Sequence, residues 1–269
     1  AFLTPTIIRV ADLETSEMIK LINTTQRDLM FAFANEVADM CDAVGVSAID
    51  VIRAGNMGYA RASMPVPGPV GGPCLEKDPF ILSEGVELNG GNPRMPLRGR
   101  EIHETLPERT ADTVAQAMAE KNVDTPIDKI CVLGLAFKGR PETSDLRGTL
   151  AIPLLTALKD RFPGAEITSY DPLVSADEAA EIGYKACASP EDAFKNANCV
   201  IYQNNNPKFE HLNLAELSSA MKPSGVIYDL WNQYDSETLI LRNDVSYFGL
   251  GTKVLLHKPR GLKTAVAAE

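Results

Sequence analysis

Cysteine is scarce in this sequence of 269 residues, and its five cysteines are widely spread. They stand at positions 41, 74, 131, 187 and 199, and no two have CxxC spacing. An odd number of isolated cysteines predicts neither a disulfide framework nor a zinc site, so we expect no bound metal. Reduced thiols are typical of the cytosol, and we therefore expect a cytoplasmic protein.

Basic residues are outnumbered, with 26 lysines and arginines against 36 acidic residues and a formal net charge of −10. No basic run stands out along the chain. Because nucleic-acid binding needs a basic patch or stripe, the composition argues against a nucleic-acid partner. An anionic ligand would need a few locally placed cations.

Long apolar runs are also missing. No stretch approaches the roughly 20 apolar residues of a membrane span, and the first residues lack the basic start and apolar core of a signal peptide. We therefore expect no membrane association. Hydrophobic residues still make up 45% of the chain, which suffices for real cores, and the length favours two domains.

The first of these domains, residues 1–125, is predicted to be helical. Apolar residues recur from Met18 to Val44 in steps of three, four and seven, which predicts a long helix over 14–45. Asp12 or Thr15 can cap its start, and Gly45 suits its end. Arg27 and Asn35 fall on its polar side and are expected at a surface or an interface. A short extended piece is expected at 7–10, and further helices at 48–54 and 98–120. Another helix is expected after the cysteine-containing loop, with Asp78 as its N-cap and Pro79 as its first residue.

The second domain, residues 126–262, alternates short β-branched runs with helical ones. This alternation predicts a parallel, doubly wound sheet, so the fold class is α/β with a Rossmann-like second domain. The tail 263–269 is expected to be disordered. The expected strands are 130–133, 167–170, 199–202, 226–229 and 245–248, and the expected helices are 149–161, 175–182, 190–195 and 214–221.

A glycine- and proline-rich loop, PGPVGGPCLEKDP at 67–79, carries the most chemistry. Its glycines allow a tight fold that brings Cys74 against a helix start. The helix N-terminus and the neighbouring Lys77 both favour a thiolate, and Asp78 could act as a base or position a water. On spacing alone, a structural cysteine with ordinary capping charges explains the loop equally well.

Several motifs, taken in order, resemble the UDP-glucose/GDP-mannose dehydrogenase family. GGPCLEKDP resembles its GGxCxxKD active-site motif, and KLINTTQRDLMFAFANE, from Lys20 to Glu36, resembles its long central helix. The resemblance covers residues 7–257. Further matching motifs are VLGLAFK at 132–138, TSDLR at 143–147 and YDP at 170–172.

The resemblance implies oxidation of the C6 hydroxyl of a UDP-sugar to a carboxylate by two NAD+, through a Cys74 thioester, for polysaccharide biosynthesis. A UDP-N-acetylmannosamine type of substrate is favoured, and UDP-glucose is possible. Lys20 would stabilise an oxyanion, and Asp78, with Lys77, would activate water. Either Thr24 or Asn23 would take the place of the family's substrate-positioning asparagine.

The resemblance also implies that the second domain holds UDP, with Lys138 and Arg147 as cations facing the phosphates or the other domain. Gly71 and Gly72 would lie beside the substrate, and Arg61 would reach the sugar site of a neighbouring subunit. The helix over 14–45 would pair two copies in a homodimer. Lys138 to Arg147 is two residues longer here than in the family pattern, His103 is expected to be structural, and Trp231 would either stack on a base or pack.

NAD would bind elsewhere. Gly134-x-Ala136-x-x-Gly139 looks like a degenerate dinucleotide fingerprint, but family members bind NAD through an N-terminal domain, whose GxGxxG and catalytic glutamate do not occur in this sequence. We therefore expect the chain to lack the NAD domain and to be inactive alone. Two alternatives stay open: a UDP-sugar-binding and dimerisation module without activity, or an independent NAD-binding protein with a helical appendage.

Overall fold

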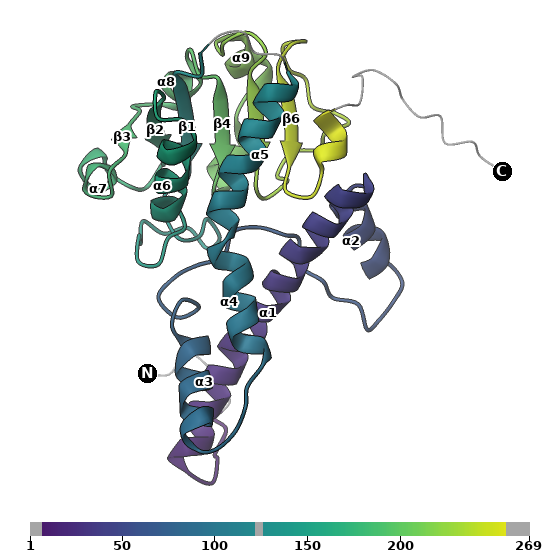
Figure 1. Ribbon diagram of the computed structural model, residues 1–269, viewed down its shortest axis with the longest axis vertical. Helices are drawn as coiled ribbons and strands as arrows, with labels where there is room; N and C mark the ends of the chain where they lie inside the picture. Colours follow the sequence, from purple (N-terminus) through teal and green to yellow (C-terminus); the bar gives the residue numbers. More distant parts are fainter. Residues whose placement is uncertain (1–6, 122–125, 257–269) are drawn as a thin grey trace, which may run out of the picture.

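The computed structural model describes residues 7–121 and 126–256. Figure 1 shows a helical part below and an α/β part above, and the long helix α1 (Leu13–Val44) runs obliquely from one toward the other. Asp12 accepts a hydrogen bond from Thr15 N at 2.7 Å and so caps the start of α1. Gly45 ends the helix in the left-handed conformation, at φ 75°. The predicted helix over 14–45 is confirmed to within one residue.

The other helices of the first part are α2 (Ala48–Asn56), α3 (Asp78–Leu88), α4 (Met95–Glu104) and α5 (Leu106–Glu120). The single helix expected over 98–120 is wrong, because the chain breaks between α4 and α5 at Thr105. Pro107 explains the break, since proline lacks a backbone N–H and its ring clashes with the preceding turn. The extended piece expected at 7–10 forms no strand.

Asp78 was expected as the N-cap of its helix, and this expectation is also wrong. Lys77 occupies the cap position and makes no side-chain capping bond, while Asp78 is the first helical residue. The Asp78 carboxylate instead accepts hydrogen bonds from two ammonium groups. Hydrogen bonds to charged donors are stronger than those to a backbone N–H, which accounts for the preference.

The second part is a six-stranded, wholly parallel sheet in the order β3-β2-β1-β4-β5-β6. This is the doubly wound order. Ile130 of β1 pairs with Ile167 of β2 on one side and with Cys199 of β4 on the other. The strands are β1 (Lys129–Leu133), β2 (Glu166–Tyr170), β3 (Lys185–Ala186), β4 (Cys199–Tyr202), β5 (Val226–Asp229) and β6 (Ser246–Gly249). Only β3, with two residues, was not predicted.

Helices cover both faces of this sheet, and successive strand residues point to opposite sides. One face packs against α8 (Pro190–Phe194) and α9 (Leu214–Ser219). The other packs against α5 and α6 (Ala151–Arg161) and is continuous with buried residues of α1 and α2. A single apolar core therefore joins the C-terminal half of α1 to the sheet. The remaining elements are α7 (Ala176–Glu181), η1 (Pro207–His211) and η2 (Lys253–Leu256).

Helix α5 connects the two parts. It lies against α6 and β5, and Figure 1 shows it crossing one face of the sheet. The predicted domain boundary at 125/126 adjoins residues 122–125, and the predicted tail at 263–269 belongs to 257–269; both segments lie outside the described residues. Both remain predictions.

Candidate active site

Lys20, Asp78 and Cys74 come together where α1 passes the start of α3. The Lys20 ammonium donates to Asp78 Oδ2, and Lys77 Nζ donates to Asp78 Oδ1 at 2.8 Å. Asp78 is buried, with 1% of its side chain exposed, whereas 53% of the Lys20 side chain is exposed. The sequence therefore identified residues that the fold brings together from positions 58 residues apart.

The two charged partners shift each other's pKa. Burial raises the pKa of Asp78, but hydrogen bonds from Lys20 and Lys77, with a smaller contribution from nearby Thr24, outweigh this and leave it lowered. The hydrogen bond to Asp78 raises the pKa of Lys20, and attraction by Cys74 adds to the effect. At neutral pH the site therefore holds an ionised carboxylate between ammonium groups.

Cys74 is exposed and lies one turn before α3. Its carbonyl accepts from Asp78 N at 2.9 Å and from Lys77 N at 3.3 Å, so the turn that carries the thiol leads directly into the helix. The Cys74 side chain is also close enough to Lys20 to help raise the pKa of the lysine. An accessible sulfur beside a cation and a helix start can serve as a nucleophile.

Thr24 lies inside this cluster. Its hydroxyl donates to Lys20 O at 3.0 Å, and it lies close enough to Asp78 to help lower the pKa of that carboxyl. Asn23 is exposed on the adjacent side of α1. The geometry therefore favours Thr24 over Asn23 as the residue at the site, and the substrate-positioning role itself stays a prediction.

Gly71 and Gly72 place the cysteine loop against the α/β part. Gly72 N donates to Gly148 O at 2.9 Å. A Cβ on Gly71 would lie 2.3 Å from Gly148 O, and one on Gly72 would lie 2.6 Å from the Phe137 ring. Gly72 also has φ +103°, which side chains rarely adopt. Both glycines are therefore required for close packing at this seam, and their contact with a substrate stays a prediction.

The predicted substrate cations lie near the same seam. Lys138 Nζ sits 5.1 Å from the centre of the Phe137 ring. Arg147 is exposed and donates to Asp145 through Nε at 3.0 Å and Nη2 at 2.7 Å. These bonds lower the pKa of Asp145 to about 2, and Cys74 is among the groups that attract Arg147. Arg61 lies exposed in the loop after α2, and its role toward a neighbouring subunit stays a prediction.

The turn after β1 is already filled. Asp171 Oδ2 accepts from Leu135 N at 2.7 Å and from Ala136 N at 3.3 Å. A Cβ on Gly139 would lie 2.1 Å from Asn206 N. In a dinucleotide fingerprint the backbone amides of this turn and the helix directly behind it bind the pyrophosphate. Here β1 ends at Leu133 and α6 begins only at Ala151, so no helix starts directly behind this turn as it does in that fingerprint.

The sequence did not reveal the buried polar group behind the loop. Asn35 was expected at a surface or interface, and this is wrong, because it is fully buried and bonded to Gly68. Arg27 is exposed, as expected. His103 is buried and structural, bonded to Asp28 O at 3.0 Å. The seven-residue spacing of Asp28 and Asn35 on one helix face could have indicated a polar contact between helices.

Trp231 packs in the structure. Its indole Nε1 donates to Gln203 O at 3.0 Å, and its ring meets Phe31 edge-on at 6.4 Å. A Cβ on Gly68 would lie 2.7 Å from the indole. The tryptophan therefore packs against the start of the cysteine loop. This packing explains the position of the ring without stacking on a nucleotide base.

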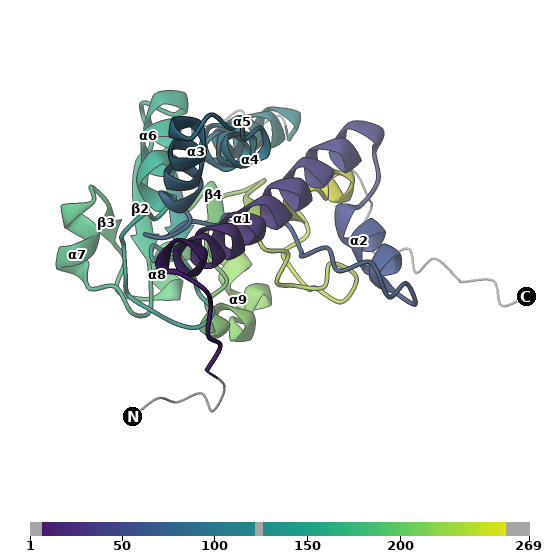
Figure 2. The same ribbon diagram turned by 90° about the horizontal axis from the view of Figure 1, so that it is seen from below.

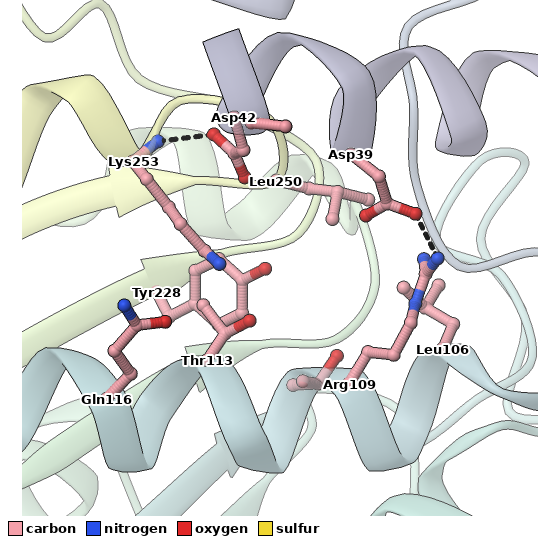
Figure 3. Close-up of a pocket in the computed structure, with 11 residues that line it drawn as sticks. Asp39, Asp42, Leu106, Arg109, Thr113, Gln116, Tyr228, Leu250 and Lys253 are labelled. Carbon is pink, nitrogen blue, oxygen red and sulfur yellow. Dashed lines mark hydrogen bonds and ion pairs between the residues drawn. The ribbon is translucent and has the colours of Figure 1, made fainter. Parts of the chain in front are cut away.

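A cavity of about 310 Å³ lies apart from Cys74, between α1, α5 and the sheet. Figure 3 shows two of its carboxylates bonded: Asp39 to the Arg109 guanidinium, and Asp42 to the backbone N–H of Lys253. This pairing ties α1 to α5 and to η2, so we regard the cavity as part of the seam between the two parts. Its lining is Asp39, Asp42, Ala43, Leu106, Arg109, Thr110, Thr113, Gln116, Tyr228, Leu250 and Lys253.

Among residues 7–121 and 126–256, no group of three or more His, Cys, Asp or Glu side chains is placed to hold a metal ion. In the same described ranges, no helix combines the length and apolarity needed to cross a membrane.

Two family models match the chain. Residues 14–104 match the central domain of the UDP-glucose/GDP-mannose dehydrogenase family, and residues 131–236 match the UDP binding domain of the same family. Together with the helical part, the parallel sheet and the Cys74 loop between them, these matches define a nucleotide-sugar dehydrogenase type of chain. The chain belongs to the UDP-glucose/GDP-mannose dehydrogenase family.

Curated relatives and solved structures agree. A UDP-N-acetyl-D-mannosamine dehydrogenase from Methanococcus vannielii is 28% identical over 247 residues, 88% of this chain and 54% of the relative. The structure of the corresponding enzyme from Pyrococcus horikoshii superposes with a TM-score of 0.74 at 26% identity, covering 88% of this chain and 52% of that one. A structure of the UDP-N-acetyl-mannosamine dehydrogenase Cap5O from Staphylococcus aureus superposes with a TM-score of 0.73 at 29% identity, covering 91% of this chain and 53% of that one. The chain spans about half the length of these relatives.

Proposed function

We propose that this chain supplies the covalent chemistry and the UDP-sugar binding of a nucleotide-sugar 6-dehydrogenase, with a UDP-N-acetylhexosamine of the mannosamine type as substrate, for polysaccharide biosynthesis. The observation that carries the proposal is the cluster of Lys20, Asp78 and the exposed Cys74. The names of the relatives favour an N-acetylated sugar, since they include a UDP-N-acetyl-D-mannosamine dehydrogenase and a UDP-N-acetyl-D-glucosamine 6-dehydrogenase from Pseudomonas aeruginosa. The five cysteines are free of disulfides, which supports a cytoplasmic location.

NAD+ is the hydride acceptor that the family implies, and we propose that it is held outside this chain, because the turn after β1 is filled by Asp171. On this chain, the Cys74 sulfur bonds to the C6 aldehyde carbon, and the Lys20 ammonium faces the oxygen that gains negative charge. The first hydride transfer to NAD+ has by then converted the C6 hydroxyl to this aldehyde. A second hydride transfer from C6 leaves a thioester, which water cleaves to the carboxylate, freeing Cys74.

Asp78 suits one part of this chemistry better than another. Its lowered pKa makes the carboxylate a weak proton acceptor, because a general base works best with a pKa near the operating pH. Two ammonium groups bind it, and it is buried. We therefore propose that Asp78 holds Lys20 in place and orients the attacking water.

We also propose a homodimer through α1. Ile19, Phe33 and Met40 are 46%, 51% and 49% exposed and recur at multiples of seven residues, so they share one face of the helix. A row of large exposed apolar side chains on one helix face is typical of an interface. Arg61 would then face the site of the second copy.

Titration calorimetry of the purified chain with UDP, the UDP-sugar and NAD+ tests the functional proposal. We expect UDP and the UDP-sugar to bind, NAD+ not to bind, and the chain alone to form no NADH. Bound UDP-sugar should also protect Cys74 from iodoacetamide. A chain that binds UDP-sugar but leaves Cys74 unprotected would favour the alternative of a binding and dimerisation module, and tight NAD+ binding would contradict the assignment of the second domain.

A further inference from the structure

The side chain of Asn35 brackets the backbone of Gly68, at the start of the cysteine loop. Asn35 Oδ1 accepts from Gly68 N at 2.8 Å, and Asn35 Nδ2 donates to Gly68 O at 3.1 Å. The asparagine is fully buried. One amide therefore satisfies both buried polar groups of a single loop residue, as a paired strand would.

His103 of α4 fixes which way this amide faces. Its Nε2 lies 3.0 Å from Asp28 O, which can only accept, so Nε2 carries the proton. Nδ1 is then an acceptor, and Asn35 Nδ2 donates a hydrogen bond to it at 3.4 Å. Burial lowers the pKa of His103 to about 4, so this neutral tautomer persists at neutral pH. The Asn35 oxygen is thereby left facing Gly68 N–H.

The support behind His103 is rigid. Arg100 of α4 donates to Asp28 of α1 at 2.9 Å, and both side chains are buried, at 3% and 0% exposure. This ion pair joins α4 to α1, but the Asn35 side chain bonds to Gly68 and His103 and to neither member of the pair. The charged groups that face His103 are Asp28, Arg100 and, at longer range, Arg109.

Trp231 packs against Gly68 on the side away from Asn35. A Cβ there would lie 2.7 Å from the Trp231 indole, which is itself bonded to Gln203 of the α/β part. From Gly68 to Gly72 the loop stays buried, and it ends in the bond from Gly72 N to Gly148 O. Cys74 follows two residues later, so the path of the loop sets where the thiol lies.

We propose that Asn35 is a positioning residue for Cys74: by bracketing Gly68 it fixes the course of the cysteine loop and so holds the thiol against Lys20 and Asp78. The meaning of this position for catalysis rests on the proposed function. The positioning of the thiol by Asn35 does not rest on that function, because it can be measured as the reactivity of Cys74 in the chain without substrate. Without the Asn35 amide, the Gly68 N–H and C=O lose their partners and the loop must shift to find others.

The test is the rate at which iodoacetamide alkylates Cys74 in the full chain, followed by peptide mass mapping at pH 7. Asn35→Ala should slow alkylation about fivefold, because the thiol leaves the Lys20 ammonium. Asn35→Asp is isosteric; it keeps the acceptor for Gly68 N–H but loses the donor to Gly68 O and to His103. Its rate should lie between those of Asn35→Ala and the unaltered chain.

Asp28→Asn is the matched control, since it breaks the ion pair to Arg100 and leaves the bracket on Gly68 in place. It should lower stability to urea while leaving the Cys74 rate within about twofold of the unaltered chain. An unchanged Cys74 rate in both Asn35 variants, or an equal loss of rate in Asp28→Asn, would overturn the proposal. Because failure of the proposed function appears as absent UDP binding, the two results are separable.

Discussion

Lys20 of α1 and Asp78 of α3 form an ion pair whose partners differ sharply in burial: 1% of the carboxylate side chain is exposed and 53% of the lysine. Burying an unpaired carboxylate is costly, so the pair stabilises the contact between the two helices as well as the site. Lys77 is the second partner of the same carboxylate. Stability and chemistry therefore depend on the same residues here.

Replacing Lys20 with methionine should reveal this double role. Asp78 keeps only Lys77, and we expect the free energy of unfolding to fall by about 1–3 kcal/mol, measured by urea denaturation. Alkylation of Cys74 should slow at the same time. Lys159→Met, an exposed lysine on α6, is the control and should change neither quantity; an equal loss in both variants would argue against a specific role for the pair.

His103 predicts a pH dependence of stability. Burial lowers its pKa from the ordinary histidine value of about 6.5 to about 4 in the folded chain, so between these values the unfolded chain binds more protons. Stability should thus be fully present above pH 6.5 and fall as the pH drops toward 4, by about 3 kcal/mol from this residue. The measurement is urea denaturation from pH 4 to 7, comparing the chain with His103→Gln. An identical pH slope in both would refute the assignment.

Gly72 predicts a packing defect. A Cβ there would meet the Phe137 ring at 2.6 Å, on a backbone with φ +103°. Gly72→Ala should therefore cost about 2–4 kcal/mol of unfolding free energy. Gly58→Ala, at φ +70° with open space around it, should cost only about 1 kcal/mol. Adding Phe137→Ala to Gly72→Ala should give less than additive loss, and strict additivity would show that the two do not touch.

Phe33 predicts the oligomeric state. If α1 pairs two copies, Phe33→Asp should shift the chain from dimer to monomer in light scattering coupled to size-exclusion chromatography, because a charge would be buried in an apolar interface. Ile152→Asp, at a similarly exposed apolar residue on α6 (44% against 51%), is the control and should leave the dimer intact. A monomer in the unaltered chain would remove the proposal.

Much of the fold could be predicted from the sequence because it is encoded locally. The seven-residue apolar recurrence of α1 and the β-branched runs of the sheet each carry their own period, and Cys199–Tyr202 and Val226–Asp229 form strands at the predicted residues. The two-residue strand β3 lacks any such period. The break at Thr105 was missed although Pro107 marks it, because the apolar pattern continues on both sides.

The residues of the site were likewise predicted where the signal is local in the sequence and missed where it is not. Cys74, Lys77 and Asp78 are neighbours in sequence, and family motifs linked them to Lys20. Asn35 and His103 belong to different helices. Asn35 falls on the polar side of its helix and His103 was expected only to be structural, so the tertiary contact alone shows that the two are buried together. Asp171 was likewise noticed only as part of a motif, and its bonds to the turn after β1 become visible only with the strands side by side.

Helix α1 carries Lys20 and Asn35 on one unbroken rod, 15 residues apart, which corresponds to about 22 Å at 1.5 Å per residue. Inserting or deleting a single residue between them would rotate one against the other by about 100° and shift it along the axis. Substitutions along the exposed face leave this alignment untouched. Figure 2 shows α1 as one continuous helix, so a change in its length would displace Lys20 relative to Asn35, whereas a substitution of an exposed residue would not.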